Sequence, residues 1–164
     1  SEAERNAIGI YEVTIDTTNK KDEAYYTNTD VSYGVESNKA VGSYGTATPK
    51  LLEDRNEVDD AGEPLLDDNG NQIVTKGLKS QKKDIIKQQA SKLLTDTDWY
   101  VIKATDVAEY SVPSAVSTFR ADVRQRSNEM ETAIDNASDV DALASLYVYI
   151  DGERPLGEWP VLEV

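Results

Sequence analysis

The chain has 164 residues, contains neither cysteine nor histidine, and carries 31 acidic against 17 basic side chains, for a formal net charge of −14. Without cysteine and histidine it cannot form disulfides, thiolate or imidazole metal sites, or a catalytic triad that uses histidine. So strong a negative charge repels phosphate backbones, and we expect no binding of nucleic acid by the chain as a whole.

Targeting and membrane signals are missing from the sequence pattern. No apolar run approaches the ~20 residues that a membrane-spanning helix needs, and the opening residues 1–5 are polar. We therefore expect a soluble protein made in a cytoplasm, with no membrane partner.

Residues 1–50 have the composition of β-strands. Residues 8–15 alternate apolar and polar side chains, residues 23–35 are rich in tyrosine, threonine and valine, and residues 39–48 form a weaker third candidate. The economical prediction is a small antiparallel β-sheet in which three strands follow one another as a meander.

Residues 51–77 form an acidic arm, in which residues 51–75 alone carry a net charge of −7. The pair Asn69-Gly70 predicts a tight turn and a protruding hairpin over residues 63–75. The same turn invites a calcium interpretation, but placing Gly70 at the sixth position of an EF-hand puts Leu65 where a carboxylate is required. We predict an exposed arm with no metal ion and no cofactor.

Residues 78–164 predict a helical region. Apolar residues at helical spacing indicate helices over residues 79–94, over about 22 residues beginning at a Ser114 N-cap, and after a capping pattern Ser138-x-x-Asp141, whereas residues 99–102 look extended. The six lysines of residues 76–92 are interpreted as the solvated face of the first helix. Candidate core positions are Leu78, Ile85, Ile86, Ala90, Leu93, Leu94, Val116, Phe119, Val123, Met130, Ala133, Ile134, Ala137, Val140, Leu143, Leu146 and Tyr147.

The sequence therefore predicts an α+β fold: an N-terminal small antiparallel sheet (residues 1–50), a protruding hairpin arm (51–77) and a three-helix C-terminal region (78–164). No motif in it predicts an enzyme. Ser80-Gln81-Lys82-Lys83 matches a Ser-x-x-Lys pattern but lacks its companion motifs. Carboxylate pairs such as Asp96 with Asp98 arise freely in so acidic a chain.

Several short motifs occur in a distinctive order: Leu93 to Lys103 (LLTDTDWYVIK), then Val112-Pro113-Ser114, Phe119 to Arg124 (FRADVR), and a closing Trp159-Pro160. Over about residues 79–160 this order resembles the C-terminal region of bacteriophage tail-fibre assembly proteins, the tail assembly chaperone-like family. Phe119 stands where that family usually has tyrosine, and the arm 51–77 looks like an insertion.

The resemblance implies a non-enzymatic protein that binds the tail fibre. It would act as an assembly chaperone in the host cytoplasm or stay in the virion tail as a minor component, and a trimeric fibre would then dictate its oligomeric state. The alternative is a virion structural protein of the tail, neck or fibre adaptor with no chaperone role. Two rivals from other classes are a glycan hydrolase that uses paired carboxylates and an acidic mimic of nucleic acid.

Six residues are the candidates for partner binding: Trp99, Tyr100, Arg120, Arg124, Trp159 and Pro160. We expect Trp99, Phe119 and Trp159 to meet in the core between the helices. Arg120 and Arg124 lie four residues apart on one helix face, and we expect them to form a carboxylate clamp. An internal clamp, to Asp98 or Glu158, is favoured over one that faces a partner.

Overall fold

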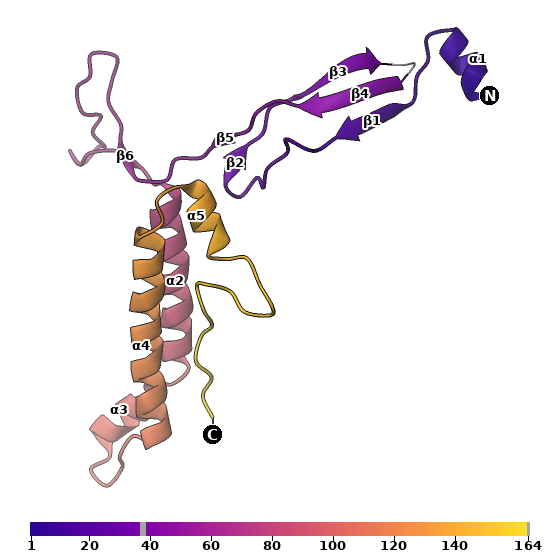
Figure 1. Ribbon diagram of the computed structural model, residues 1–164. Coiled ribbons are helices and arrows are strands. Elements are labelled where there is room, and N and C mark those ends of the chain that lie inside the picture. The colour runs from indigo at the N-terminus through magenta and orange to yellow at the C-terminus, as the bar shows by residue number, and fades with distance from the viewer. Residues whose placement is uncertain (37–38, 164) are drawn as a thin grey trace. The chain divides into compact units, whose positions relative to one another are not determined.

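The structure is a computed structural model that describes residues 1–36 and 39–163 and falls into two compact units, residues 1–50 and 51–164. The predicted α+β class is confirmed, because short strands near the N-terminus are followed by helices (Figure 1). The elements are α1 (Glu2–Ala7), β1 (Val13–Asp16), β2 (Tyr26–Thr27), β3 (Val31–Glu36), β4 (Lys39–Tyr44), β5 (Thr48–Pro49), β6 (Arg55–Asn56), β7 (Val74–Thr75), α2 (Leu78–Thr95), α3 (Asp98–Asp106), α4 (Ser114–Asp135) and α5 (Val140–Ser145).

The first unit contains a three-stranded sheet with the strand order β1-β4-β3. β3 and β4 form the expected antiparallel hairpin, but β1 pairs with β4 in parallel, with Val13 opposite Ala40. The predicted meander is therefore wrong. The chain that leaves β1 first forms β2, which pairs with β5 in a separate ladder, so β3 does not become the neighbour of β1.

The start of the chain also differs from the prediction. Residues 2–7 form α1, which Ser1 caps through its side chain while Glu4 completes the capping box. Residues 8–12, predicted as part of the first strand, lie outside β1. The signal for α1 was present as a serine followed three residues later by a glutamate.

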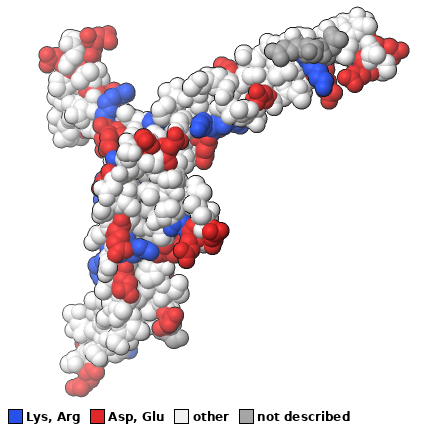
Figure 2. Space-filling view, in the orientation of Figure 1, with Lys and Arg blue, Asp and Glu red and all other residues white. Residues whose placement is uncertain are grey.

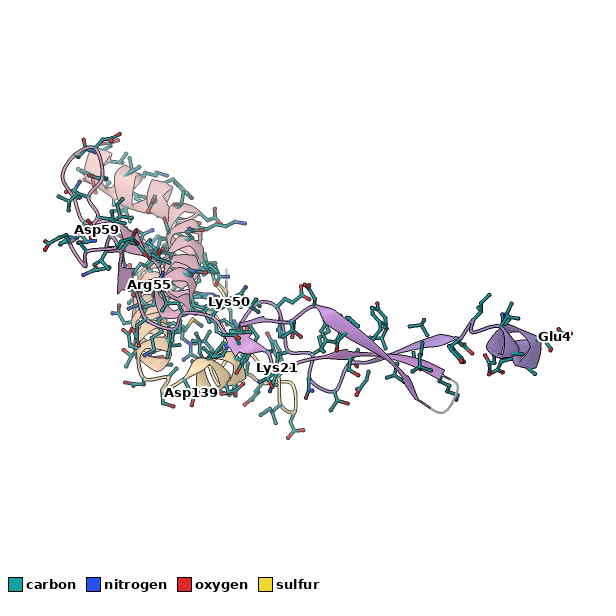
Figure 3. All side chains as sticks on the ribbon, turned by 90° about the horizontal axis from the view of Figure 1, so that it is seen from above. Glu4, Lys21, Lys50, Arg55, Asp59 and Asp139 are labelled. Atoms are coloured by element: carbon teal, nitrogen blue, oxygen red, sulfur yellow. The ribbon has the colours of Figure 1, made fainter. Side chains whose placement is uncertain are left out.

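The acidic arm contains two turns of the same design, eight residues apart. Asp59 Oδ1 accepts hydrogen bonds from the backbone N–H groups of Ala61 and Glu63, at 2.8 and 2.9 Å. Asp67 Oδ1 accepts them from the corresponding residues 69 and 71, at 2.9 and 2.8 Å. Gly62 and Gly70 follow at equivalent positions with φ of +84° and +81°. The predicted Asn69-Gly70 turn is confirmed. The earlier turn at Asp59, which is labelled in Figure 3, was not predicted from the sequence.

Hydrogen bonds close this arm on itself. Glu57, Leu65 and Ile73 follow one another at intervals of eight residues. The Leu65 N–H donates to the Glu57 carbonyl, the Ile73 N–H to the Leu65 carbonyl and the Glu57 N–H to the Ile73 carbonyl, at 2.8–2.9 Å, which closes a ring of three hydrogen bonds. Gln72 Nε2 donates to all three of these carbonyls, at 2.7, 3.1 and 3.0 Å. The arm is thus ordered by its own backbone, and acidic side chains cover its far end (Figure 2).

The core of the second unit lies between α2 and α4, which run antiparallel side by side (Figure 1). The predicted apolar stripes are largely confirmed: Ile85, at 45% exposure, is the clear exception. The buried apolar side chains described in this unit are Leu78, Ile86, Ala90, Val116, Phe119, Val123, Met130, Ile134, Ala137, Val140, Leu143 and Leu156.

The start of α2 is capped from outside the helix. Its N-cap, Gly77, has no side chain, and the Gly77 N–H donates to Asp54 Oδ1 at 2.8 Å. The next two N–H groups donate to the carbonyls of Leu51 and Leu52, at 2.8 and 3.1 Å. A Cβ at residue 77 would lie 2.4 Å from the carbonyl group of Glu53, so only glycine permits this approach.

Three predictions about the helices need correction. Residues 99–102 are helical, in α3, because Asp98 in the first turn and Lys103 in the last turn favour a helix over a short extended run. The N-cap of α4 is Pro113 and not Ser114. The N-cap of α5 is Asp139 and not Ser138, since the Asp139 side chain accepts a hydrogen bond from the Ala142 N–H at 2.7 Å. With α3, the C-terminal region has one helix more than the three that were predicted.

We predict that Ile134→Ala lowers the free energy of unfolding of the helical unit by about 2–5 kcal/mol, because the Ile134 side chain is fully buried and its loss leaves a cavity. Ile85→Ala is the matched control on α2 and should change it by less than about 1 kcal/mol. Urea unfolding followed by the helical circular dichroism signal measures both. Equal losses would show that the core does not lie where the structure places it.

We also predict a pH dependence at the start of α2. A hydrogen bond from the Gly77 N–H, and then one from the Ser80 hydroxyl, hold the pKa of Asp54 below its ordinary value of 3.8. A carboxylate with a lowered folded-state pKa stabilises the fold above 3.8, and that stabilisation is lost as the pH falls through the folded pKa. Asp54→Asn should therefore lower the melting temperature at neutral pH, and the difference from the unmodified chain should shrink well below pH 3.8. A difference that stays constant with pH would contradict this.

Candidate protein-binding site

Arg120 on α4 joins the end of α2 to the start of α3. Its Nη1 donates to the Leu94 carbonyl at 2.8 Å and to Thr97 Oγ1 at 2.6 Å, and it pairs with Asp98 Oδ1 at 2.8 Å. The Arg120 side chain is only 13% exposed, so these contacts are partly shielded from water. The expected internal clamp to Asp98 is confirmed for Arg120, which fixes where α3 leaves the helical hairpin.

Arg124 does not take part in that clamp. It is exposed, and its Nη1 donates at 3.0 Å to the backbone carbonyl of Arg120 instead of to a carboxylate. The other expected partner, Glu158, pairs with Arg154 Nε at 2.9 Å. The prediction of a two-arginine clamp is therefore wrong for Arg124, whose position one turn further along α4 takes it past Asp98.

Trp159 holds the C-terminal segment on the helices. Its ring packs on the buried cluster of Ala90, Phe119 and Val123, and its Nε1 donates to Gln89 Oε1 at 2.9 Å. The expected meeting of Trp159 with Phe119 is confirmed. Pro160 follows, half-buried, at the edge of a shallow open pocket beside Trp159.

Arg126 anchors the same segment from α4. Its Nε donates to the Glu158 carbonyl at 2.9 Å, and its Nη1 pairs with Glu129 at 2.9 Å. Hydrogen bonds from Gln125, and then from Arg126, lower the pKa of Glu129. A Cβ at Gly157 would lie 2.3 Å from the guanidinium of Arg126, so that side chain would have to shift, and the φ of +80° at residue 157 itself favours glycine. Trp159 and Pro160 are thus fixed parts of the fold.

The lysines of α2 are not simply a solvated face. Lys79 is buried, and its Nζ donates to Glu53 Oε1 at 2.5 Å and to the Asp135 carbonyl at 2.9 Å. Lys83 pairs with the Asp135 carboxylate at 2.7 Å, a hydrogen bond that raises the pKa of Lys83. Lys87 lies 3.5 Å from the carboxylate of Glu131. Lys79, Lys83 and Lys87, which lie on one face of α2, therefore pair with acidic residues of the arm and of α4.

Trp99 lies on the surface, contrary to prediction. It is 51% exposed on α3, and its ring stacks on the half-buried Tyr100 with 3.9 Å between centroids. The expectation that Trp99 joins the core failed because it assumed an extended chain, whereas the helix that forms here has no buried residue.

Three other exposed apolar side chains lie on α3 or directly after its last residue. Val101, Ile102 and Val107 are 41%, 61% and 44% exposed. We call these three residues and Trp99 the α3 surface. The end of the helical unit formed by α3 shows few charged side chains on the face drawn in Figure 2. Exposed apolar groups gathered in this way are typical of protein contact sites.

The six sequence candidates thus separate into different roles. Arg120 and Trp159 serve the interior, and Arg124 and Pro160 lie beside them; Trp99 belongs to the α3 surface, and the half-buried Tyr100 stacks against it. Sequence reasoning did not include Val101, Ile102 or Val107 among the binding candidates. For Ile102 a signal was present, because it follows Trp99 at the three-residue spacing of a helix.

Among residues 1–36 and 39–163, no group of three or more acidic side chains is placed to hold a metal ion. Within the same residues, no helix combines the length and the apolar character needed to cross a bilayer. Comparison of the chain with protein-family models, with curated proteins and with solved structures found no match.

We predict that Arg120→Ala lowers the free energy of unfolding of the helical unit by about 1–3 kcal/mol, because it leaves the Leu94 carbonyl and Thr97 without their charged donor. Arg124→Ala, on the same helix face, should cost less than about 1 kcal/mol, since its side chain is exposed. Denaturant unfolding compares the two variants. If Arg124→Ala lowered the free energy of unfolding as much as Arg120→Ala, the conclusion that only Arg120 holds the α2–α3 junction would be wrong.

Proposed function

We propose that this chain is a non-enzymatic bacteriophage tail protein that binds the tail fibre through the α3 surface. The observation that carries the proposal is the 51% exposure of Trp99, with Ile102 exposed on the same side of α3 one turn further along. Trp99 belongs to the sequence motif that resembles tail-fibre assembly proteins. A large aromatic side chain held at the surface is costly to leave in water and is a frequent anchor of protein contacts.

The supporting argument concerns how the patch is held. Arg120 bonds the α2–α3 junction at Leu94, Thr97 and Asp98, so the direction of α3 is fixed before any partner arrives. A rigid patch loses less conformational entropy on binding than a mobile one. The remaining motif residues, Phe119 and Trp159, then act at a distance by holding the helical hairpin together.

The proposal includes two modes of action. An assembly chaperone leaves once the fibre has trimerised, whereas a minor virion component stays at a fixed ratio to the fibre. The alternative function, a structural protein of the tail, neck or fibre adaptor, requires retention without any effect on fibre folding. Mass spectrometry of purified virions separates retention from release.

We predict that co-expression with the tail-fibre gene of the same phage raises the yield of soluble fibre, and that Trp99→Ala removes most of this gain. Removal of an aromatic anchor commonly weakens a contact by about 2 kcal/mol or more, which is tenfold or more in affinity. Soluble fibre on a gel and co-purification with a tagged copy of this chain give the measurement.

Ile85→Ala is the matched control, because Ile85 is an apolar residue of similar exposure, 45%, away from the α3 surface. It should leave both fibre yield and co-purification unchanged. A fibre that neither gains solubility nor co-purifies with the unmodified chain would overturn the proposal. Equal effects of the two variants would place the contact elsewhere on the chain.

A further inference from the structure

The second turn of the acidic arm contains the one asparagine in the sequence that a glycine follows, Asn69 before Gly70. Asn69 is exposed, and Gly70 has a φ of +81° with nothing within 4 Å of the place where a Cβ would stand. With no side chain at residue 70 and open space around that position, nothing shields the main-chain nitrogen of Gly70 on that side. Asparagine is also one of the thermolabile residues of proteins.

The Gly70 nitrogen is a nucleophile within reach of the Asn69 side chain, since the two groups belong to neighbouring residues. Its attack on Cγ of Asn69 forms a C–N bond and closes a five-membered imide. The C–N bond of the side-chain amide breaks, and the amide nitrogen leaves as ammonia with the proton that the Gly70 nitrogen loses. Water then opens the imide at either carbonyl. Residue 69 becomes an aspartate or an isoaspartate and carries one negative charge that asparagine lacks.

The closed turn holds the Gly70 nitrogen back, because its N–H donates to the Asp67 carbonyl at 2.9 Å. The turn must therefore open before the reaction can start. Residues 58–71 are all exposed, so no buried apolar contact has to be broken when it opens. Local opening is easiest where a segment has few buried contacts and exposed backbone hydrogen bonds.

The product fits the turn less well than asparagine does. Asp67 Oδ1 accepts from the N–H groups of Asn69 and Asn71. Hydrogen bonds from the backbone and side chain of Asn71, and then from those of Asn69, hold the pKa of Asp67 below its ordinary value of 3.8. A carboxylate at residue 69 replaces an amide donor beside Asp67 with a second negative charge. An isoaspartate also lengthens the main chain by one methylene. Both changes oppose closure of the turn.

The first turn of the arm provides an internal comparison. It has the same hydrogen bonds, on Asp59, and the same left-handed glycine, Gly62. Ala61 stands where the second turn has Asn69, and alanine has no amide to lose. The two turns thus share one backbone geometry and differ in chemistry at a single equivalent position.

We propose that Asn69 is a site of spontaneous deamidation, exposed to the reaction by the open turn and its left-handed glycine. Water is the only co-reactant. Glu57, Leu65 and Ile73 take no part in it, so the ring of three hydrogen bonds in the arm stays intact. The chain gains one negative charge beyond its net charge of −14. The inference does not rest on fibre binding, because it concerns the arm and not the α3 surface.

The test is incubation of the full chain at neutral and at alkaline pH, followed by proteolysis and fragment mass spectrometry of the peptides. The gain in mass from amide to acid is then assigned to single residues. We expect residue 69 to react several-fold faster than Asn71, which lies in the same turn but precedes Gln72. The reaction should be several-fold faster at alkaline pH, since the Gly70 nitrogen must lose its proton.

Two variants give matched controls. Asn69→Gln keeps an amide but places it one methylene further from the main chain, and should lose most of the reaction at this position. Ala61→Asn creates an Asn-Gly pair in the first turn, and should add a second site that reacts at a similar rate because the geometry is the same.

Three results would overturn the proposal. One is a reaction at Asn69 no faster than at Asn71 in the unmodified chain. Another is an undiminished reaction in Asn69→Gln. The third is an Ala61→Asn variant that stays unmodified while Asn69 reacts, which would show that the shared turn does not make the site. Because the first comparison uses the unmodified chain, a variant that fails to fold does not remove the test.

Discussion

The helical unit depends on the buried ammonium group of Lys79. It binds the Glu53 carboxylate in the arm and the Asp135 carbonyl at the C-terminal end of α4, and so joins three segments at one point. A cation at a helix C-terminus also meets the negative end of the helix dipole. Because a buried charge without partners is costly, these contacts form together or not at all. The start of α2 and the end of α4 are fixed against each other for this reason.

The attachment of the arm to the start of α2 explains how the acidic arm can carry so much charge and still be ordered. Residues 51–54 supply the caps of α2, through two carbonyls and the Asp54 carboxylate, so the base of the arm is part of the helical unit. Beyond it, the cyclic hydrogen bonds of Glu57, Leu65 and Ile73 fix the backbone without any apolar core. Repulsion among the outer carboxylates then acts on side chains that water surrounds, where it is weak.

The parts of the fold that sequence could predict are those with a strong local period. The stripes of α2 and α4 specify their buried faces, and Asn69-Gly70 specifies its turn, because each signal lies within a few residues. The parallel pairing of β1 with β4 could not be derived in this way, since it joins residues 27 apart with no local cue. The repeated Asp-Asp-x-Gly pattern of the arm was visible at its eight-residue spacing, but it takes the structure to show that both copies fold alike.

The candidate site shows why residue type alone does not assign a role. Trp99 and Trp159 are both large aromatic residues and both were expected in the core, yet Trp99 is half exposed and Trp159 packs on Phe119. The difference comes from chain direction: Arg126 pulls the C-terminal segment back onto α4, whereas Arg120 directs α3 away from the hairpin at its far end. Contacts of two arginines on one helix thus accompany the different positions of the two tryptophans, one packed on the core and one at the surface.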